Sequence, residues 1–124
     1  MKKTKMMKKN YEFRNVLSKG NYYSGKYIEA FIKRNGKENV NFLGIAIGVK
    51  LAKAVKRNHI KRLLRENYRD FEESIKDGYY IVFLWKKKAD MKNANFQNIK
   101  KDMQTIFDKA KIIEENIWKN YLYG

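Results

Sequence analysis

A row of basic side chains between Lys53 and Arg69 has the residue types and the spacing to bind a polyanion. The stretch holds no Gly or Pro, and its apolar residues recur at helical intervals, which predicts an amphipathic helix. Like charges four residues apart repel by a few tenths of a kcal/mol per pair, and a bound anion, phosphate above all, would relieve that repulsion. On the helix one arc carries Ile60, Leu63, Leu64 and Phe71, and the arc beside it carries Arg57, Asn58, Lys61, Arg62, Arg65 and Arg69.

The class of partner follows from this face and from the overall charge. A basic helical face is often only solvated surface, and that interpretation stays open for the helix by itself. Asn58 favours RNA, because asparagine is a mediocre helix former and here could bond a ribose, a phosphate or a base edge. The formal net charge of +16, from 29 Lys and Arg against 13 Asp and Glu, predicts a polyanionic partner. Nucleic acid is the first candidate for this partner, and an anionic membrane is the second.

Groups that could catalyse hydrolysis are scarce. His59 is the one histidine, and we interpret it as a partly buried helix residue or a further RNA donor rather than a general base. Without Cys there is no thiolate nucleophile or ligand. The adjacent pairs Glu72–Glu73 and Glu114–Glu115 would diverge by about 100° on a helix, which makes them poor ligands for two metal ions. The sequence therefore predicts no catalytic side chain and no metal site in the protein.

The chain has the size of one domain, 124 residues, and a hydrophobic content of 44% supports a packed core. No apolar run approaches the roughly 20 residues that a membrane span needs, and no apolar segment of a secretory signal follows the lysine-rich start. The absence of Cys agrees with a cytoplasmic location. We expect residues 1–9, with five lysines, to be a flexible basic arm, and residues 10–124 to form a single domain.

The first half of the chain predicts one helix and two strands. Asn10 can cap a helix that runs to about Ser18, with Gly20 just past its end. Tyr22–Arg34 has the alternation of a strand, and the turn at Asn35–Gly36 predicts a hairpin with a second strand over Val40–Val49. One face of that second strand carries small residues, which would admit either an extended nucleotide chain or a closely packed helix. That face carries Phe42, Gly44, Ala46 and Gly48, of which the last three are small.

The second half predicts the basic helix over Ala54–Ile75, a central strand over Tyr79–Trp85 and a docking helix over Asn95–Ala110. A weaker helix over Ile112–Tyr123 has no place that the sequence decides. The order helix, strand, strand, helix, strand, helix indicates an α+β sandwich of one domain with a central basic helix between strands. A β-α-β unit around that helix would by default be right-handed.

The string A-V-K-R-N-H-I-K-R-L-L-R-E, Ala54 to Glu66, closely resembles the signature of the bacterial ribonuclease P protein subunit. The core of that signature, R-N-x-x-K-R-x-x-R, is matched by Arg57, Asn58, Lys61, Arg62 and Arg65, and the resemblance covers most of the chain. It implies a left-handed crossover, and a catalytic RNA that cleaves precursor tRNA with Mg²⁺ held mainly by RNA. The protein would bind the catalytic RNA and the single-stranded 5′ leader of the substrate.

The resemblance also implies two separate surfaces. The central helix would face the catalytic RNA through Lys53, Arg57, Asn58, Lys61, Arg62 and Arg65. Phe13, Leu17 and Phe31 would face the leader, with Leu17 standing where a second aromatic residue is common. Ordinary core packing is the alternative for all three. No obligate protein partner is evident. Another RNA-binding protein, such as a ribosomal or RNA-assembly module, would need the same charge and many of the same aromatic residues.

Overall fold

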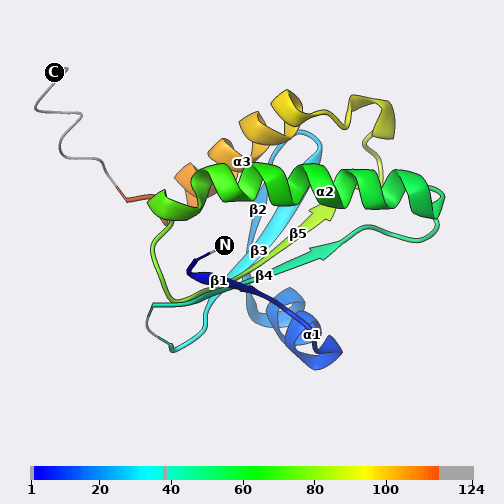
Figure 1. Ribbon diagram of the computed structural model, residues 1–124. Coiled ribbons are helices and arrows are strands. Elements are labelled where there is room, and N and C mark those ends of the chain that lie inside the picture. The colour runs from blue at the N-terminus through cyan, green and yellow to red at the C-terminus, as the bar shows by residue number, and fades with distance from the viewer. Residues whose placement is uncertain (1, 38, 115–124) are drawn as a thin grey trace, which may run out of the picture.

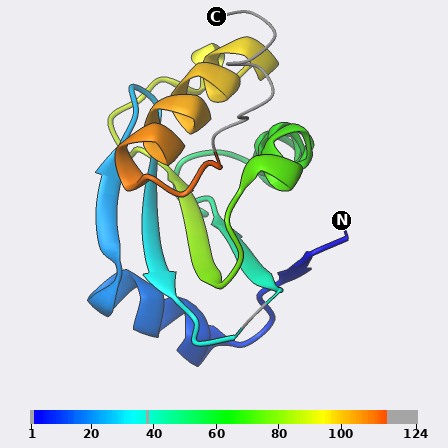
Figure 2. The same cartoon turned by 90° about the vertical axis from the view of Figure 1, so that its left-hand side faces the viewer.

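The computed structural model describes residues 2–37 and 39–114, which form one α+β domain around a five-stranded sheet. Helices α2 and α3 cover one face of the sheet, and α1 covers part of the other (Figures 1 and 2). The strands lie in the order β1-β4-β5-β3-β2. Along the chain the elements are β1 (Thr4–Met6), α1 (Asn10–Lys19), β2 (Asn21–Ser24), β3 (Ile28–Arg34), β4 (Asn41–Ala46), α2 (Ala54–Phe71), β5 (Tyr79–Trp85) and α3 (Phe96–Ala110).

The main core lies between the sheet and the helix pair α2 and α3. Strand β3 alternates as its sequence predicts, with Ile28, Ala30 and Ile32 buried against the helices. Phe107 of α3 is fully buried where it joins α2 to β5, its ring near those of Tyr68, Phe71 and Phe83. This core fixes which face of α2 remains outside.

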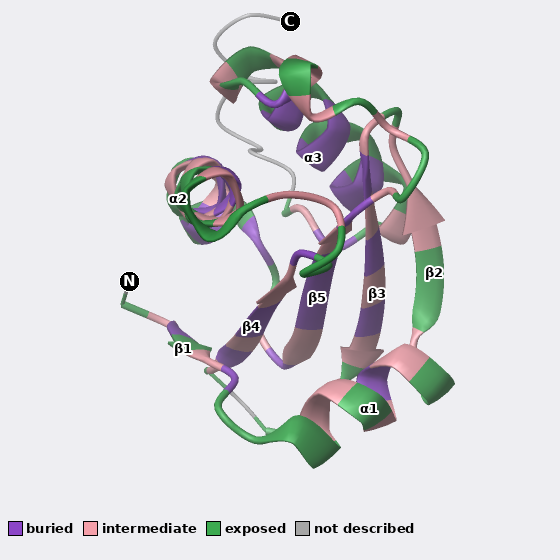
Figure 3. Cartoon of the chain, turned by 90° about the vertical axis from the view of Figure 1, so that its right-hand side faces the viewer, coloured by how far each residue is buried: buried purple, intermediate pink, exposed green. Residues whose placement is uncertain are grey.

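The connection from β4 through α2 to β5 joins two parallel, adjacent strands. Seen from the helix side with both strands pointing upward, β5 lies to the left of β4, so the crossover is left-handed (Figures 1 and 3). The default right-handed expectation is therefore wrong here, and the expectation from the family resemblance is confirmed. The crossover carries α2 along the β4 side of the sheet, beside the N-terminal strand.

The N-terminal arm differs from its prediction. Thr4–Met6 form β1, which pairs in parallel with β4 at the edge of the sheet. The Thr4 hydroxyl lies 2.8 Å from that of Tyr68, and burial raises the pKa of Tyr68 to about 12. A flexible arm over residues 1–9 is thus wrong for residues 4–6, because a partner in α2, distant in sequence, holds them.

The predicted hairpin between the expected strands Tyr22–Arg34 and Val40–Val49 is also wrong. β5 lies between β3 and β4, antiparallel to the first and parallel to the second. Gly36 still makes the turn with a positive φ of 73°, but the chain there crosses the end of β5 instead of folding back beside β3. The reason is the nearly continuous apolar run of β5, which gains most from being covered on both faces and paired on both edges.

The single strand expected over Tyr22–Arg34 is two strands, β2 and β3, paired antiparallel around a turn. Asp102 of α3 holds that turn, accepting hydrogen bonds from the backbone N–H groups of Lys26, Tyr27 and Ile28 at 2.7–3.0 Å. Gly25 is required beside it, since a Cβ there would stand 2.6 Å from the carboxyl carbon of Asp102. A carboxylate more than 70 residues away thus decides where the strand breaks.

Other boundaries shift by a few residues. Lys9, and not Asn10, occupies the N-cap of α1, without a side-chain hydrogen bond. The basic helix ends at Phe71 and passes into a 3-10 turn, Glu72–Ser74. The docking helix α3 is confirmed, with the Asn95 side chain accepting from the N–H of Asn98. The strand over Tyr79–Trp85 is confirmed as the central one, and most of the helix expected over Ile112–Tyr123 lies outside the described residues.

Candidate RNA-binding surfaces

Helix α2 buries one side and leaves the other free. Ile60, Leu64 and Tyr68 are fully buried against the sheet and α3. Figure 3 shows the helix end-on, with its buried residues on the side toward the sheet and exposed ones on the outer side. The structure brings the predicted residues together on this outer side: Lys53, Asn58 and Arg62 are exposed, and Arg57, Lys61 and Arg65 are partly exposed. We call these six residues the α2 face.

Two arginines of the α2 face have partners within the protein. The guanidinium of Arg57 donates to the carbonyl of Ala52 at 2.6 Å and more weakly to that of Val49 at 3.4 Å, so it holds the loop before the helix. Arg62 pairs with Glu66 at 2.9 Å, one helical turn away and at the surface. Such an exposed pair contributes only a few tenths of a kcal/mol, and a phosphate can displace it. The row thus stays available to an anion.

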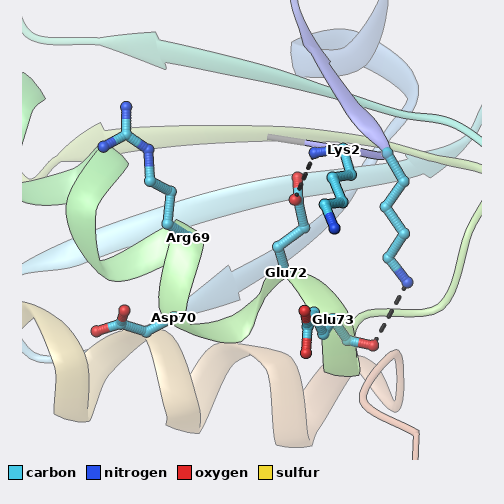
Figure 4. Close-up of a pocket in the computed structure, with 6 residues that line it drawn as sticks. Lys2, Arg69, Asp70, Glu72 and Glu73 are labelled. Atoms are coloured by element: carbon cyan, nitrogen blue, oxygen red, sulfur yellow. Dashed lines mark hydrogen bonds between the residues drawn. The ribbon is translucent and has the colours of Figure 1, made fainter.

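A hollow marks the place where β1 meets the end of α2 (Figure 4). The Lys3 ammonium donates to the carbonyl of Ile75 at 2.7 Å and pairs with Asp77 at 3.2 Å. The backbone N–H of Lys2 donates to the Glu72 carboxylate at 3.0 Å. Acidic and basic groups are mixed around this hollow. Its side chains therefore hold the N-terminal strand in place and are not suited to binding phosphate. Its lining residues are Lys2, Lys3, Arg69, Asp70, Glu72 and Glu73.

The opposite face of the sheet carries the other predicted residues. Phe13 and Leu17 of α1 and Phe31 of β3 are partly exposed and surround a small core of Met7, Val16 and Val82. Phe31 also lies beside Tyr22, with ring centroids 5.2 Å apart. The structure therefore brings Phe13, Leu17 and Phe31 together on the side away from the α2 face.

Gly44 explains how α1 lies so close to the sheet. A Cβ there would stand 2.7 Å from two ring atoms of Phe13 and 3.0 Å from the sulfur of Met7. Of the two reasons considered for the small residues of β4, close helix packing accounts for this one. Gly48 belongs to the following turn, where a Cβ would meet the Leu51 side chain at 3.2 Å.

Three cross-strand rows run over this face, and α1 covers two of them. Asn15 of α1 accepts a hydrogen bond from Lys33 over the first row, and Phe13 lies on Gly44 in the second. The third row has no α1 side chain above its hollow and lies open. In order the rows are Phe42–Tyr80–Lys33, Gly44–Val82–Phe31–Tyr22 and Ala46–Leu84–Glu29–Ser24.

Sequence reasoning missed two residues of the open region, Tyr22 and Glu29. The Tyr22 hydroxyl donates to Glu29 at 2.6 Å, and this hydrogen bond raises the pKa of Tyr22. A single strand over Tyr22–Arg34 would place the two residues on opposite faces, since their positions differ by an odd number. Recognising the turn at Gly25 would have brought them together.

Replacing Gly44 with Ala should lower the free energy of unfolding by about 1–3 kcal/mol, because the new methyl group must displace the Phe13 ring from a packed contact. Urea unfolding followed by circular dichroism measures the change. Gly48→Ala is the matched control, because only the flexible Leu51 side chain has to move. Equal effects from the two substitutions would contradict the packing role given to Gly44.

Within residues 2–37 and 39–114, no three Asp, Glu or His side chains gather in a way that could hold a metal ion. Of the helices in those same ranges, none combines the length and the apolar character that crossing a bilayer would take.

Comparisons with known proteins agree with one another. The profile of the family described as Ribonuclease P matches residues 1–111. A protein of Natranaerobius thermophilus named Ribonuclease P protein component is 34% identical over 111 residues, which cover 90% of this chain and 94% of that protein. One of the same name from Fusobacterium nucleatum is 38% identical over 109 residues, covering 86% and 97%.

Two solved structures have a fold similar to that of this chain. The RNase P protein of Staphylococcus aureus superposes with a TM-score of 0.76 at 26% identity, over 88% of this chain and 97% of that one. The RNase P protein of Thermotoga maritima gives a TM-score of 0.74 at 23% identity, over 85% and 96%.

Proposed function

The chain belongs to the ribonuclease P protein family, and from this premise we propose that its two surfaces serve two different RNAs. As the protein component of that ribonucleoprotein endoribonuclease, it works with the ribonuclease P RNA on a tRNA substrate. The α2 face binds the catalytic RNA, and the α1 side of the sheet binds the single-stranded 5′ leader of precursor tRNA. The observation that carries the proposal is the placement of the cationic row and the aromatic cluster on opposite sides of one sheet. Figure 3 shows α2, which carries the row, and α1, which contributes to the cluster, on these two sides.

The α2 face suits folded RNA because a helix holds its charges at fixed spacing. Its buried stripe anchors the helix, so the arginines meet phosphates without first ordering a loop. Asn58 is exposed among them and can donate to a ribose or a base edge as well as to phosphate. Lys53 extends the row at the N-terminal end, where the positive end of the helix dipole adds to the attraction for anions.

The leader surface suits an unpaired strand of varying sequence. Stacking a base on an aromatic ring contributes roughly 1–3 kcal/mol and tolerates every base. Phe31 offers such a ring beside Tyr22, and Phe13 of α1 packs against the same small core as Phe31. Leu17 gives an apolar contact at a position where the family often has an aromatic ring, so less stacking is expected there.

We place the chemistry of cleavage on the RNA. The acidic side chains described here do not gather into a site that fits a divalent ion, so Mg²⁺ is assigned mainly to RNA and no catalytic step is given to the protein. The protein's part is to help the RNA fold and bind, and to extend substrate recognition to the leader. We assign this work to the cytoplasm, with no obligate protein partner.

Reconstitution tests the function directly. Adding the protein to ribonuclease P RNA at low Mg²⁺ should restore removal of the 5′ leader, measured as cleavage of end-labelled precursor tRNA. An unrelated RNA-binding protein of similar net charge is the control, since it supplies cations without the two surfaces. Failure of the protein to rescue cleavage, or equal rescue by the control, would reject the assignment.

Two single substitutions should separate the surfaces. Arg65→Ala should weaken binding to the catalytic RNA and spare the preference of the holoenzyme for precursor over mature tRNA. Phe31→Ala should spare RNA binding and reduce that preference about 5- to 150-fold, the equivalent of one lost stacking contact of roughly 1–3 kcal/mol. Filter binding measures both quantities. Lys101→Ala, on an exposed position of α3, controls for the loss of one charge, and one shared defect for Arg65 and Phe31 would contradict the two-surface proposal.

A further inference from the structure

An aromatic pair with a lysine at each end lies across the sheet in the first cross-strand row. Strand β1 extends this row by one residue, since Lys5 is the register partner of Phe42. The row then continues through Tyr80 to Lys33. The ring centroids of Phe42 and Tyr80 are 5.4 Å apart, and both side chains remain partly exposed. We call these four residues the first-row platform.

Cations flank the two rings of the platform. Lys5 and Lys37 are exposed, and the ammonium of Lys37 lies 5.4 Å from the centroid of the Phe42 ring. Such a cation–π contact is weak at an exposed site, so a phosphate can draw the ammonium aside and leave the face of the ring to a base. Aromatic rings beside lysines are the surface that unpaired nucleic acids bind, with bases stacked on the rings and phosphates next to the cations.

Helix α1 separates the platform from the leader surface. At the β3 end of the row, Asn15 of α1 accepts a hydrogen bond from Lys33 at 2.6 Å. In the neighbouring row, the Phe13 ring packs so closely on Gly44 that a Cβ there would stand 2.7 Å from it. A leader strand stacked on Phe31 would therefore have to pass over α1 to reach the platform. This arrangement disfavours the leader as the ligand of the platform.

The platform can be reached from the edge of the sheet that β1 forms. Its outermost residue, Lys5, belongs to that edge strand. Helix α2 lies beside the same strand, with the hydroxyls of Thr4 and Tyr68 2.8 Å apart, and β1 lies between α2 and α1 (Figures 1 and 3). An RNA that covers the α2 face can therefore continue around β1 onto the platform. Folded RNA has unstacked bases in its loops and bulges, and proteins stack such bases on aromatic side chains.

We propose that the first-row platform binds one unpaired nucleotide of the catalytic RNA, as an extension of the α2 face around the edge of the sheet. The base stacks on Phe42 and Tyr80, and Lys5 and Lys37 bind phosphates next to it. This inference rests on the proposed function, because it takes the catalytic RNA on the α2 face as its starting point. It adds a contact that depends on aromatic rings to one that depends on charge.

Substitution of Phe42 tests the stacking contact. Phe42→Ala should weaken equilibrium binding of the catalytic RNA about 5- to 150-fold, and it should leave the salt dependence of the affinity unchanged because no charge is lost. Phe42→Leu keeps an apolar side chain against the small core and should also weaken binding. Phe31→Leu is the matched control, since it makes the same change one row away and should leave this affinity unaltered. Thermal unfolding of each variant confirms that the fold is intact.

Two further measurements locate the contact. Lys5→Ala should reduce the salt dependence of the affinity by about one phosphate contact, whereas Lys101→Ala should not change it. Chemical footprinting of the catalytic RNA at saturating protein should show one unpaired nucleotide that the unsubstituted protein protects and Phe42→Leu leaves reactive. The nucleotides that the α2 face protects should stay protected in that variant.

The outcomes separate this proposal from the one beneath it. If Phe42→Leu and Phe31→Leu affect binding of the catalytic RNA equally, or if no nucleotide loses protection, the platform is rejected. If Phe42→Leu instead reduces only the preference for precursor over mature tRNA, the platform binds the leader and the proposal is wrong. If Arg65→Ala leaves binding of the catalytic RNA unchanged, the α2 face itself is rejected. A defect in Arg65→Ala without one in either Phe42 variant would reject the platform alone.

Discussion

The affinity of the protein for the catalytic RNA should fall about a thousandfold as monovalent salt rises from 50 to 200 mM. About six phosphate contacts, five of them from the Lys and Arg residues of the α2 face, release enough counterions from the RNA to give this slope. Filter binding or fluorescence titration across the salt range measures it. A large slope is expected because the formal net charge of +16 includes few acidic groups that could replace the RNA phosphates as partners.

Single substitutions should show which residues contribute to the dependence of affinity on salt concentration. Arg62→Ala and Arg65→Ala should each reduce the slope by about one contact, and Lys101→Ala should leave it unchanged. Loss of the weak pair with Glu66 should cost Arg62→Ala little stability. An affinity that stays constant over the salt range would contradict electrostatic binding by α2. A constant slope in all three variants would instead place the phosphate contacts elsewhere on the protein.

Replacing Phe107 with Ala should lower the free energy of unfolding by about 3–5 kcal/mol. The ring is fully buried, and its centroid lies 5.4 Å from that of Phe71, 5.9 Å from that of Phe83 and 6.5 Å from that of Tyr68. Removing it leaves a cavity between α3, α2 and β5 at the point where all three meet. Urea unfolding, followed by circular dichroism, measures the change.

Thr105→Ala gives the matched control, since this exposed residue lies on the same helix and should change stability by less than about 0.5 kcal/mol. Excess catalytic RNA should restore the folded population of Phe107→Ala, because the RNA binds the folded state alone. A loss below about 1 kcal/mol would mean that α2 does not depend on α3 for its position, and the support assigned to the α2 face would then be wrong.

The elements with strong local periodicity could be predicted from the sequence. The helical spacing of Ile60 and Leu64 places the arginines of α2 correctly, because a helix fixes its own faces whatever it packs against. The alternation of β3 and the apolar run of β5 identify those strands for the same reason. The family resemblance added the left-handed crossover, which no local pattern contains.

The remainder depends on contacts between distant residues. The turn between β2 and β3 is held by the carboxylate of Asp102. The N-terminal strand β1 is held in part by the hydroxyl of Tyr68, which lies within hydrogen-bond distance of Thr4. No sequence pattern reveals the role of either residue, since Asp is common on helix surfaces and Tyr is common in cores. The placement of Glu29 beside Tyr22 follows from that break, which is why the open row could not be foreseen.

The middle strand of the sheet is the last one to leave the ribosome. β1 can meet β4, and β2 can meet β3, while the nascent chain is still growing, but only Tyr79–Trp85 joins these two halves. Until β5 is synthesised, helix α2 lacks the complete sheet that buries its apolar side. Its basic side meanwhile lies close to ribosomal RNA, which attracts it. Completion of the sheet therefore waits until β5 has been synthesised, and its folding rate is governed by closure of long-range pairs rather than by helix formation.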